Sequence, residues 1–121
     1  MATLLVNTGK AVVTNRIKGS GTEPSYVAWG TGAGTTALTD TTLFTETGTR
    51  VSGTSTQQTT TTTNDTYQVV GTQTAGGALA ITNAGLFDAS TSGNLFVKGD
   101  FSTINLSSGD SIQFTFKTQF S

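Results

Sequence analysis

The chain contains no cysteine and no histidine, and both absences exclude familiar chemistry. Without cysteine there is neither a disulfide nor a thiol nucleophile, so the sequence carries no mark of its redox compartment. Without histidine, the usual general base near neutral pH, the commonest zinc ligand and every imidazole-based triad are missing. We therefore expect a protein that is not an enzyme and that needs no cofactor and no metal.

Charge is scarce as well, because 11% of the residues are charged and the formal net charge is -1. Nucleic-acid binding requires a clustered basic face that displaces counterions. The six basic residues are scattered, apart from a small group between residues 10 and 18 that is typical of a solvated face. No apolar run approaches the roughly 20 residues of a membrane span, and MATLLVNTGK lacks the charged start of a signal peptide. We expect neither a nucleic-acid nor a membrane partner.

Threonine, glycine and serine are abundant, with 28, 15 and 11 residues, whereas there is one proline. A disordered chain normally has more charge and proline, and fewer β-branched and aromatic residues. Threonine favours strands, and glycine and serine favour turns. A chain of 121 residues can build one core but not two. The composition predicts a single all-β domain over residues 1–121.

The C-terminal segment DSIQFTFKTQFS carries the clearest strand signal. Polar residues alternate strictly with one predicted core face, made of Ile112, Phe114, Phe116, Thr118 and Phe120. Such a period of two predicts a strand with one buried face. The turn before it is Ser107-Ser108-Gly109-Asp110.

Two further strands precede this one. GNLFVKGDF places Leu95, Val97 and Phe101 on one face. In ALAITNAGLFD the apolar phase slips by one between Ile81 and Leu86. The slip predicts a bulge near residues 83–85, where glycine removes the steric cost of the bend.

The N-terminal half gives weaker signals. PSYVAWG (residues 24–30) and TLFTET (residues 42–47) predict short strands. NTGKAVVTNRIKG predicts the one helix, with Asn7 or Thr8 as its cap, Val13 and Ile17 on one face, and Gly19 as its stop. A strand over residues 11–17 is the alternative.

Five consecutive threonines, residues 59–63, allow several interpretations: a linker, an ice-binding or glycosylated surface, or a strand. Asn64 and Asp65 tolerate positive φ and predict a two-residue turn. Residues 66–74 would then return as a strand, with Tyr67 and Val69 facing inward. We expect the run to be a polar strand used in assembly, with contacts at Thr59, Thr61 and Thr63.

The segment Gly30-Thr31-Gly32-Ala33-Gly34 has the look of a phosphate-binding loop. A dinucleotide site, however, needs a different glycine spacing and a helix within a parallel βαβ unit. The segment is better interpreted as a loop after a strand.

Acidic residues are the other candidates for chemistry. A carboxylate pair for glycoside cleavage or a calcium site could in principle come from Glu23, Glu46, Asp88, Asp100 and Asp110. The three aspartates stand at predicted strand ends or turns, where carboxylates commonly accept backbone hydrogen bonds. A structural role is therefore expected for them.

The aromatic residues Tyr26, Trp29 and Tyr67 could stack on sugars or bases, but their spacing on strands favours packing. Ice binding would require threonines in regular ranks on successive strands. Here they are dense between residues 35 and 63 and sparse elsewhere. A glycan-binding module and an ice-binding protein stay as remote alternatives.

The order of the motifs is informative. The blocks AWGTGAGTTALTDTTLFTE, ITNAGLFDASTSGNL and GDSIQFT resemble those of small virion structural proteins of tailed bacteriophages. That group includes capsid decoration (cement) proteins and tail-fibre or tail-collar proteins, and the resemblance covers about residues 7–120. Many of these proteins have a glutamate in ITEAGLFD where this chain has Asn83. The resemblance implies an antiparallel β-sandwich, often jelly-roll-like, assembled as a homotrimer.

Our leading hypothesis from the resemblance is a cement protein on the capsid exterior, synthesised in the host cytoplasm. It would clamp neighbouring major capsid subunits, since multivalent attachment strengthens weak contacts. A tail, baseplate or fibre component is the alternative. Residues 1–8 could form an N-terminal arm, with Ala2 to Val6 as its apolar run and Leu4, Leu5 and Val6 as contacts. An ordinary first strand is the competing interpretation. We expect deletion of residues 1–7 to weaken shell or trimer association while leaving the sandwich folded.

Overall fold

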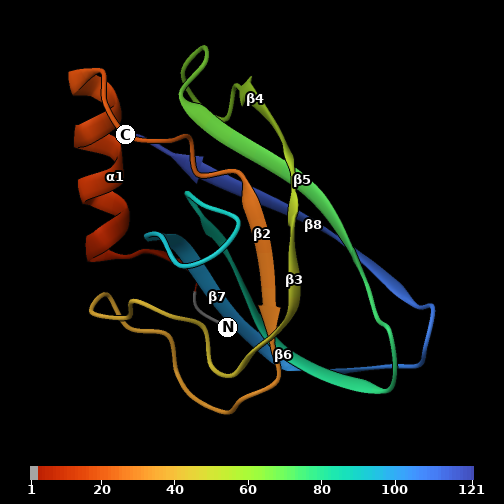
Figure 1. Ribbon diagram of the computed structural model, residues 1–121. Helices are drawn as coiled ribbons and strands as arrows, with labels where there is room; N and C mark the ends of the chain where they lie inside the picture. Colours follow the sequence, from red (N-terminus) through yellow and green to blue (C-terminus); the bar gives the residue numbers. More distant parts are fainter. Residues whose placement is uncertain (1–2) are drawn as a thin grey trace.

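The computed structural model describes residues 3–121, over which eight strands and one helix form a β-sandwich (Figure 1). The predicted all-β sandwich with one short N-terminal helix is confirmed. In chain order the elements are β1 (Thr3–Leu5), α1 (Asn7–Lys18), β2 (Tyr26–Gly30), β3 (Glu46–Ser52), β4 (Thr54–Gln58), β5 (Thr66–Thr74), β6 (Leu79–Phe87), β7 (Leu95–Leu106) and β8 (Ser111–Gln119).

The strands divide into two antiparallel sheets of unequal size. The larger sheet has the order β1-β7-β6-β2-β3 and the smaller one the order β4-β5-β8. A jelly roll likewise has eight strands in two sheets, and the jelly-roll-like detail stays a prediction. The two sheets are joined because β3 and β4 are one ribbon that turns from the larger sheet into the smaller at Gly53. A side chain at Gly53 would collide with Val69, so only glycine permits this corner.

The core lies between the sheets and is tied across them by aromatic rings. Trp29 of β2 meets Phe114 of β8 edge-to-face at 6.3 Å between centroids, and Tyr67 of β5 meets Phe96 of β7 in the same way at 5.9 Å. Trp29 is 1% exposed. The expected packing role of Trp29 and Tyr67 is confirmed.

Strands β5 and β8 match their predictions closely. β5 spans residues 66–74 as predicted, with Val69 fully buried. β8 alternates as predicted, but Phe120 lies beyond its end and is 46% exposed. The Phe120 N–H still bonds to the Asp65 carbonyl oxygen at 2.9 Å, in continuation of the β5–β8 register.

The bulge predicted at residues 83–85 is wrong in position, because these residues pair in regular register with residues 98–100 of β7. A register shift lies just before them, between Ile81 and Asn83, and the extra residues there are 101–103 of β7. A second shift, between Leu86 and Phe87, leaves Phe96 as an extra residue on β7. Bulges bend strands and re-aim side chains. As a result Phe96 and Val97, although adjacent, both join the inter-sheet core.

The strand predicted at residues 42–47 is wrong in its position, because β3 begins at Glu46 and continues to Ser52. Leu43 is buried, but it belongs to a loop packed on the larger sheet rather than to a strand. The adjacent apolar residues Leu43 and Phe44 of TLFTET therefore belong to a loop and not to a strand. The real strand was hidden by Gly48, which has φ of 73° at a register shift against β2.

The predicted helix and its stop are confirmed, since α1 ends at Gly19 with φ of 99°. Neither predicted cap is correct: Val6 is the N-cap, and it makes no side-chain cap hydrogen bond. The Asn7 N–H bonds instead to the carbonyl oxygen of Leu38, a tertiary contact that sequence cannot show. The buried face is Gly9 and Val12, whereas Ile17 is 81% exposed.

Candidate assembly surfaces

The predicted N-terminal contacts Leu4, Leu5 and Val6 lie within the domain. β1 pairs antiparallel with β7, with Leu4 opposite Lys98 and Leu5 opposite Val97. Val6 is fully buried, and Leu4 and Leu5 are partly buried. The structure therefore has the ordinary first strand, not a free arm, over the described part of this segment. Ala2, which belonged to the predicted apolar run, lies outside the described residues.

This placement corrects the expectation that residues 1–7 can be deleted without loss of the fold. The deletion would remove an edge strand and a fully buried valine whose N–H also bonds to the Phe96 carbonyl oxygen at 3.2 Å. Burial of a valine side chain stabilises a protein by about 1.5–3 kcal/mol. Weak assembly after such a deletion would therefore report unfolding rather than a lost contact.

The threonines predicted to form a strand lie instead in the loop between β4 and β5. Gln58 pairs with Thr66, so residues 59–65 form a connection longer than the predicted two-residue turn. Thr59, Thr61 and Thr63 are exposed on this loop. Their role in assembly stays a prediction, whereas their assignment to a strand is wrong.

Asp65 is the reason that this loop does not continue as a strand. Its carboxylate accepts backbone hydrogen bonds from Thr60, Thr61 and Thr62 at 2.8–3.1 Å. Three N–H groups gathered on one carboxylate require a tight turn, which an extended strand cannot provide. The backbone donors at Thr62 and Thr60 hold the pKa of Asp65 well below its usual range.

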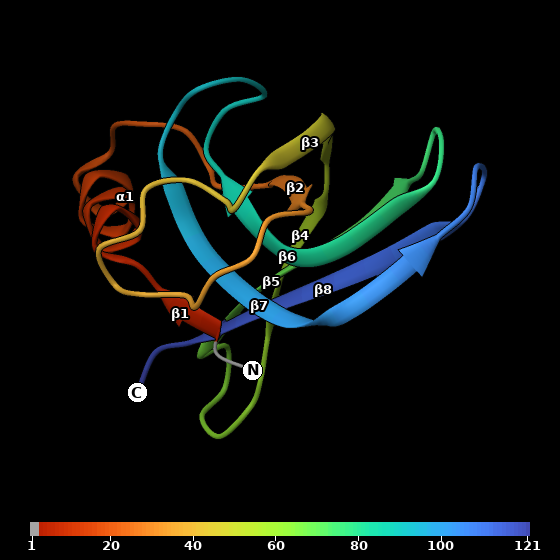
Figure 2. The same cartoon turned by 90° about the horizontal axis from the view of Figure 1, so that it is seen from below.

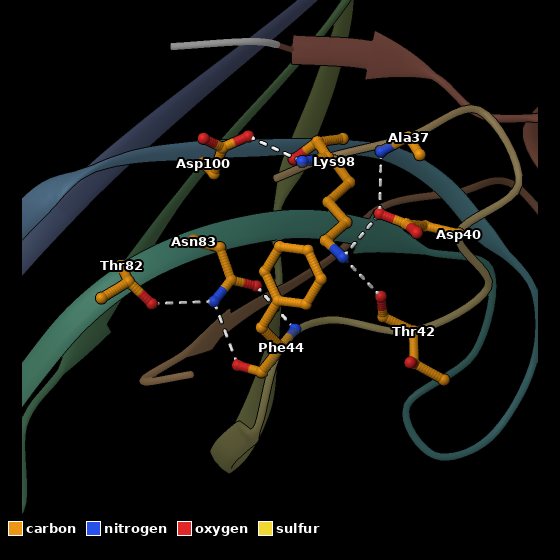
Figure 3. A network of polar contacts seen from close by, with 9 residues as sticks. Ala37, Asp40, Thr42, Phe44, Thr82, Asn83, Lys98 and Asp100 are labelled. Atoms are coloured by element: carbon orange, nitrogen blue, oxygen red, sulfur yellow. Dashed lines mark hydrogen bonds and ion pairs between the residues drawn. The ribbon is translucent and has the colours of Figure 1, made fainter. Parts of the chain in front are cut away.

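A second ordered loop, residues 31–45, covers the outer face of the larger sheet and is held by Lys98 of β7 (Figure 3). The Lys98 side chain is fully buried, and its ammonium group donates to Asp40 and to the Thr42 carbonyl oxygen, each at 2.9 Å. It also lies 3.3 Å from the ring centroid of Phe44. A buried ammonium group is tolerable only with such partners.

Asn83 of β6 holds the same loop by its backbone. Its side-chain oxygen accepts from the Phe44 N–H, and its amide nitrogen donates to the Phe44 carbonyl oxygen, both at 3.0 Å (Figure 3). An amide side chain supplies one acceptor and two donors, and a carboxylate supplies acceptors only. Asn83, at the position where similar proteins often have glutamate, is therefore a structural clamp in this chain.

The candidate acidic residues hold structure, as expected. Asp88 accepts from the Asn94 N–H at 2.6 Å, Asp110 from the Ser107 N–H at 2.8 Å, and Asp100 from the Thr36 N–H at 3.0 Å. Glu46 pairs with Arg50 at 2.8 Å, and Glu23 accepts from the Tyr67 hydroxyl. Burial, followed by the nearby Glu23 charge, raises the pKa of Tyr67.

Within residues 3–121 no three metal-ligating side chains gather, and no helix is long and apolar enough to cross a membrane.

One surface was not predicted. Opposite the closed β3–β4 corner, the sandwich is open between β8 and the β1–β7 edge of the larger sheet. A hollow of about 770 Å³ lies there, and a smaller one of about 200 Å³ adjoins it. We call this surface the open seam; its apolar lining is Ala84, Phe101, Ile104, Phe114 and Phe116.

The alternation in β7 and β8 identified Phe101, Phe114 and Phe116 as inward-facing, but it could not show that they lie at a gap. Strand order decides that point, because an inward-facing residue is covered only where a strand of the other sheet lies above it. Ile104 is 40% exposed although it pairs with the fully buried Ile81. The seam is thus the uncovered part of the core face.

Comparison with known proteins completes this description. Neither the curated proteins nor the solved structures yield a significant match. The family described as "Podophage GP4 fiber I protein gp80" matches over residues 10–119, which is nearly the whole chain. The resemblance to small virion structural proteins of tailed phages is thereby confirmed, and the chain belongs to the podophage GP4 fiber I protein (gp80) family.

Proposed function

We propose that this protein is a structural subunit of a phage tail-fibre apparatus and that its direct partners are tail or baseplate proteins. The observation that carries the proposal is the family match over residues 10–119, since the matching family is described as a fibre protein. Fold alone would not distinguish a fibre subunit from a cement protein, because both use β-sandwiches for surface contact.

The molecular architecture suits a purely structural role. The loops of residues 31–45 and 59–65 are pinned by Lys98, Asn83 and Asp65, so the surface is preformed rather than adaptable. Preformed surfaces lose little conformational entropy on association. Capsid decoration, our leading hypothesis from the sequence, has no observation of its own that favours it over a fibre role.

Location and copy number in purified particles test this proposal. We expect gold-labelled antibody to mark the tail, and quantitative mass spectrometry to give a small copy number set by tail symmetry. The major capsid protein in the same particles provides the internal standard. Labelling over the shell with hundreds of copies per particle would establish capsid decoration and overturn the fibre proposal.

A further inference from the structure

The open seam lies where one further strand of the smaller sheet, next to β8, would lie. β3 and β4 meet at the Gly53 corner, β5 lies against β2 and β3, and β8 reaches β2 through the Trp29–Phe114 pair. The smaller sheet therefore ends above the middle of the larger one. β7 and β1 extend beyond it, and Figure 2 shows β1 beside β7 on this side. Helix α1 covers β7 near Phe96 only, which leaves residues 99–104 uncovered.

The edge beside this gap is suited to accept a strand. β8 runs for nine residues and, within the described chain, pairs with β5 alone. It contains no proline and no bulge, which are the usual protections of an edge. The other edges are less suitable: β1 has three residues, β4 has five, and β3 is interrupted by its register shift.

The shape of the open seam also determines which kind of partner can pair with β8. A second copy of the sandwich cannot pair its own β8 with this edge, because its larger sheet would have to occupy the place of β7 and β1. A single extended segment has no such obstacle. It would hydrogen-bond to β8 on one side and lay alternate side chains on Phe101, Ile104 and Phe114 below.

The charge of Lys117 indicates which side chain the partner segment should carry. Lys117 contributes to the lining of both hollows, and the described ion pairs do not include it. It alternates with the inward-facing Phe116, so it projects on the outer face of the smaller sheet. An acidic side chain on the corresponding face of an added strand would lie opposite it.

We propose that the open seam binds one extended segment of a neighbouring virion protein, as a fourth strand beside β8. In the bound segment, apolar residues that face the seam floor alternate with polar residues, one of which is acidic and meets Lys117. The inference deepens the proposed assembly role by naming the partner's chemistry. It does not depend on whether the particle carries the protein on its tail or on its shell.

Two synthetic nine-residue peptides, equal in length to β8, test the proposal. Both alternate phenylalanine and threonine, and one threonine is replaced by glutamate in the first and by lysine in the second. We expect the glutamate peptide to bind the full chain about two- to fivefold more tightly, since cross-strand pairs of opposite charge are modest. Hydrogen exchange should show new protection of β8 amides. Lys117→Glu should reverse the preference.

Two matched variants distinguish peptide binding at the open seam from non-specific binding elsewhere on the surface. Ile104→Asp places a charge on the seam floor and should abolish binding of both peptides, whereas Ile17→Asp on the exposed helix face should leave it unchanged. Circular dichroism of each variant confirms that the fold is kept. The proposal is overturned if neither peptide protects β8, if Ile17→Asp is the variant that abolishes binding, or if the seam instead mediates self-association that Ile104→Asp prevents.

Discussion

At the scale of single residues, the two ordered loops depend on side chains whose hydrogen-bonding capacity matches their surroundings. Asn83 is fully buried and uses both ends of its amide on Phe44. Asp65 uses both carboxylate oxygens on the threonine loop. The sequence shows that Asn83 and Asp65 can make these hydrogen bonds, but it does not show where the loops that contain their partners lie.

We expect Asn83→Asp to lower the free energy of unfolding by at least about 2 kcal/mol near neutral pH, because a buried carboxylate would face the Phe44 carbonyl oxygen. A protonated aspartate carries a donor. The loss should therefore shrink as pH falls in Asn83→Asp, but not in Asn83→Ala. Urea unfolding of both variants across acidic pH measures this difference, and identical pH profiles would contradict the clamp.

The threonine loop should resist acid. Because the folded-state pKa of Asp65 lies below its unfolded value of about 3.9, its stabilising effect is complete above that value. The effect is lost only as pH falls through the lower, folded-state pKa. We expect the amide resonances of Thr60 to Thr62 to stay constant through pH 4, by NMR, and to move together in stronger acid. In Asp65→Asn these resonances should differ from wild type at every pH.

At the scale of elements, tertiary contact overrides helix propensity at Gly9. Alanine normally stabilises a helix interior by about 1 kcal/mol relative to glycine. A side chain at Gly9, however, would collide with the Phe96 carbonyl oxygen, so α1 approaches the backbone of β7 directly at this point. The hydroxyl of Thr8 adds a hydrogen bond to the Leu95 carbonyl oxygen at 2.7 Å.

We therefore expect Gly9→Ala to destabilise the protein by about 1–3 kcal/mol, the usual cost of overpacking. Ala11→Gly, at an exposed position two residues away, should cost only about 1 kcal/mol. Propensity alone predicts opposite signs for the two variants. Thermal unfolding of both decides, and a stabilised Gly9→Ala protein would show that the helix can move away from β7.

At the scale of the whole molecule, the core is shared by both sheets and the helix, with Val12, Trp29, Val69 and Phe116 in one cluster. A shared core is typical of a single cooperative unit, and the single domain over residues 1–121 stays a prediction. Trp29 is the only tryptophan and lies between the sheets. We expect its fluorescence and the far-ultraviolet circular dichroism to report the same unfolding midpoint in urea. Two separated midpoints would show that the sheets unfold independently.

The sequence by itself determined the fold class, the strands β5 and β8, and the helix with its glycine stop. These features depend on local steric preference and on the period of burial along one strand. The same reasoning placed Asp88 and Asp110 at turns, because carboxylate bonds to nearby backbone are local as well. It was wrong for Asp100, which lies within β7 and accepts from Thr36, a residue distant in sequence.

Only the tertiary structure decided the rest. The apolar N-terminal run resembled an arm until its pairing with β7 was known, and the threonine run resembled a strand until Asp65 was found to fold it into a loop. The open seam depends on strand order, since Phe101 is a core residue by pattern and lines a surface hollow only because the smaller sheet has three strands. Strand order is set by contacts distant in sequence, which no local pattern contains.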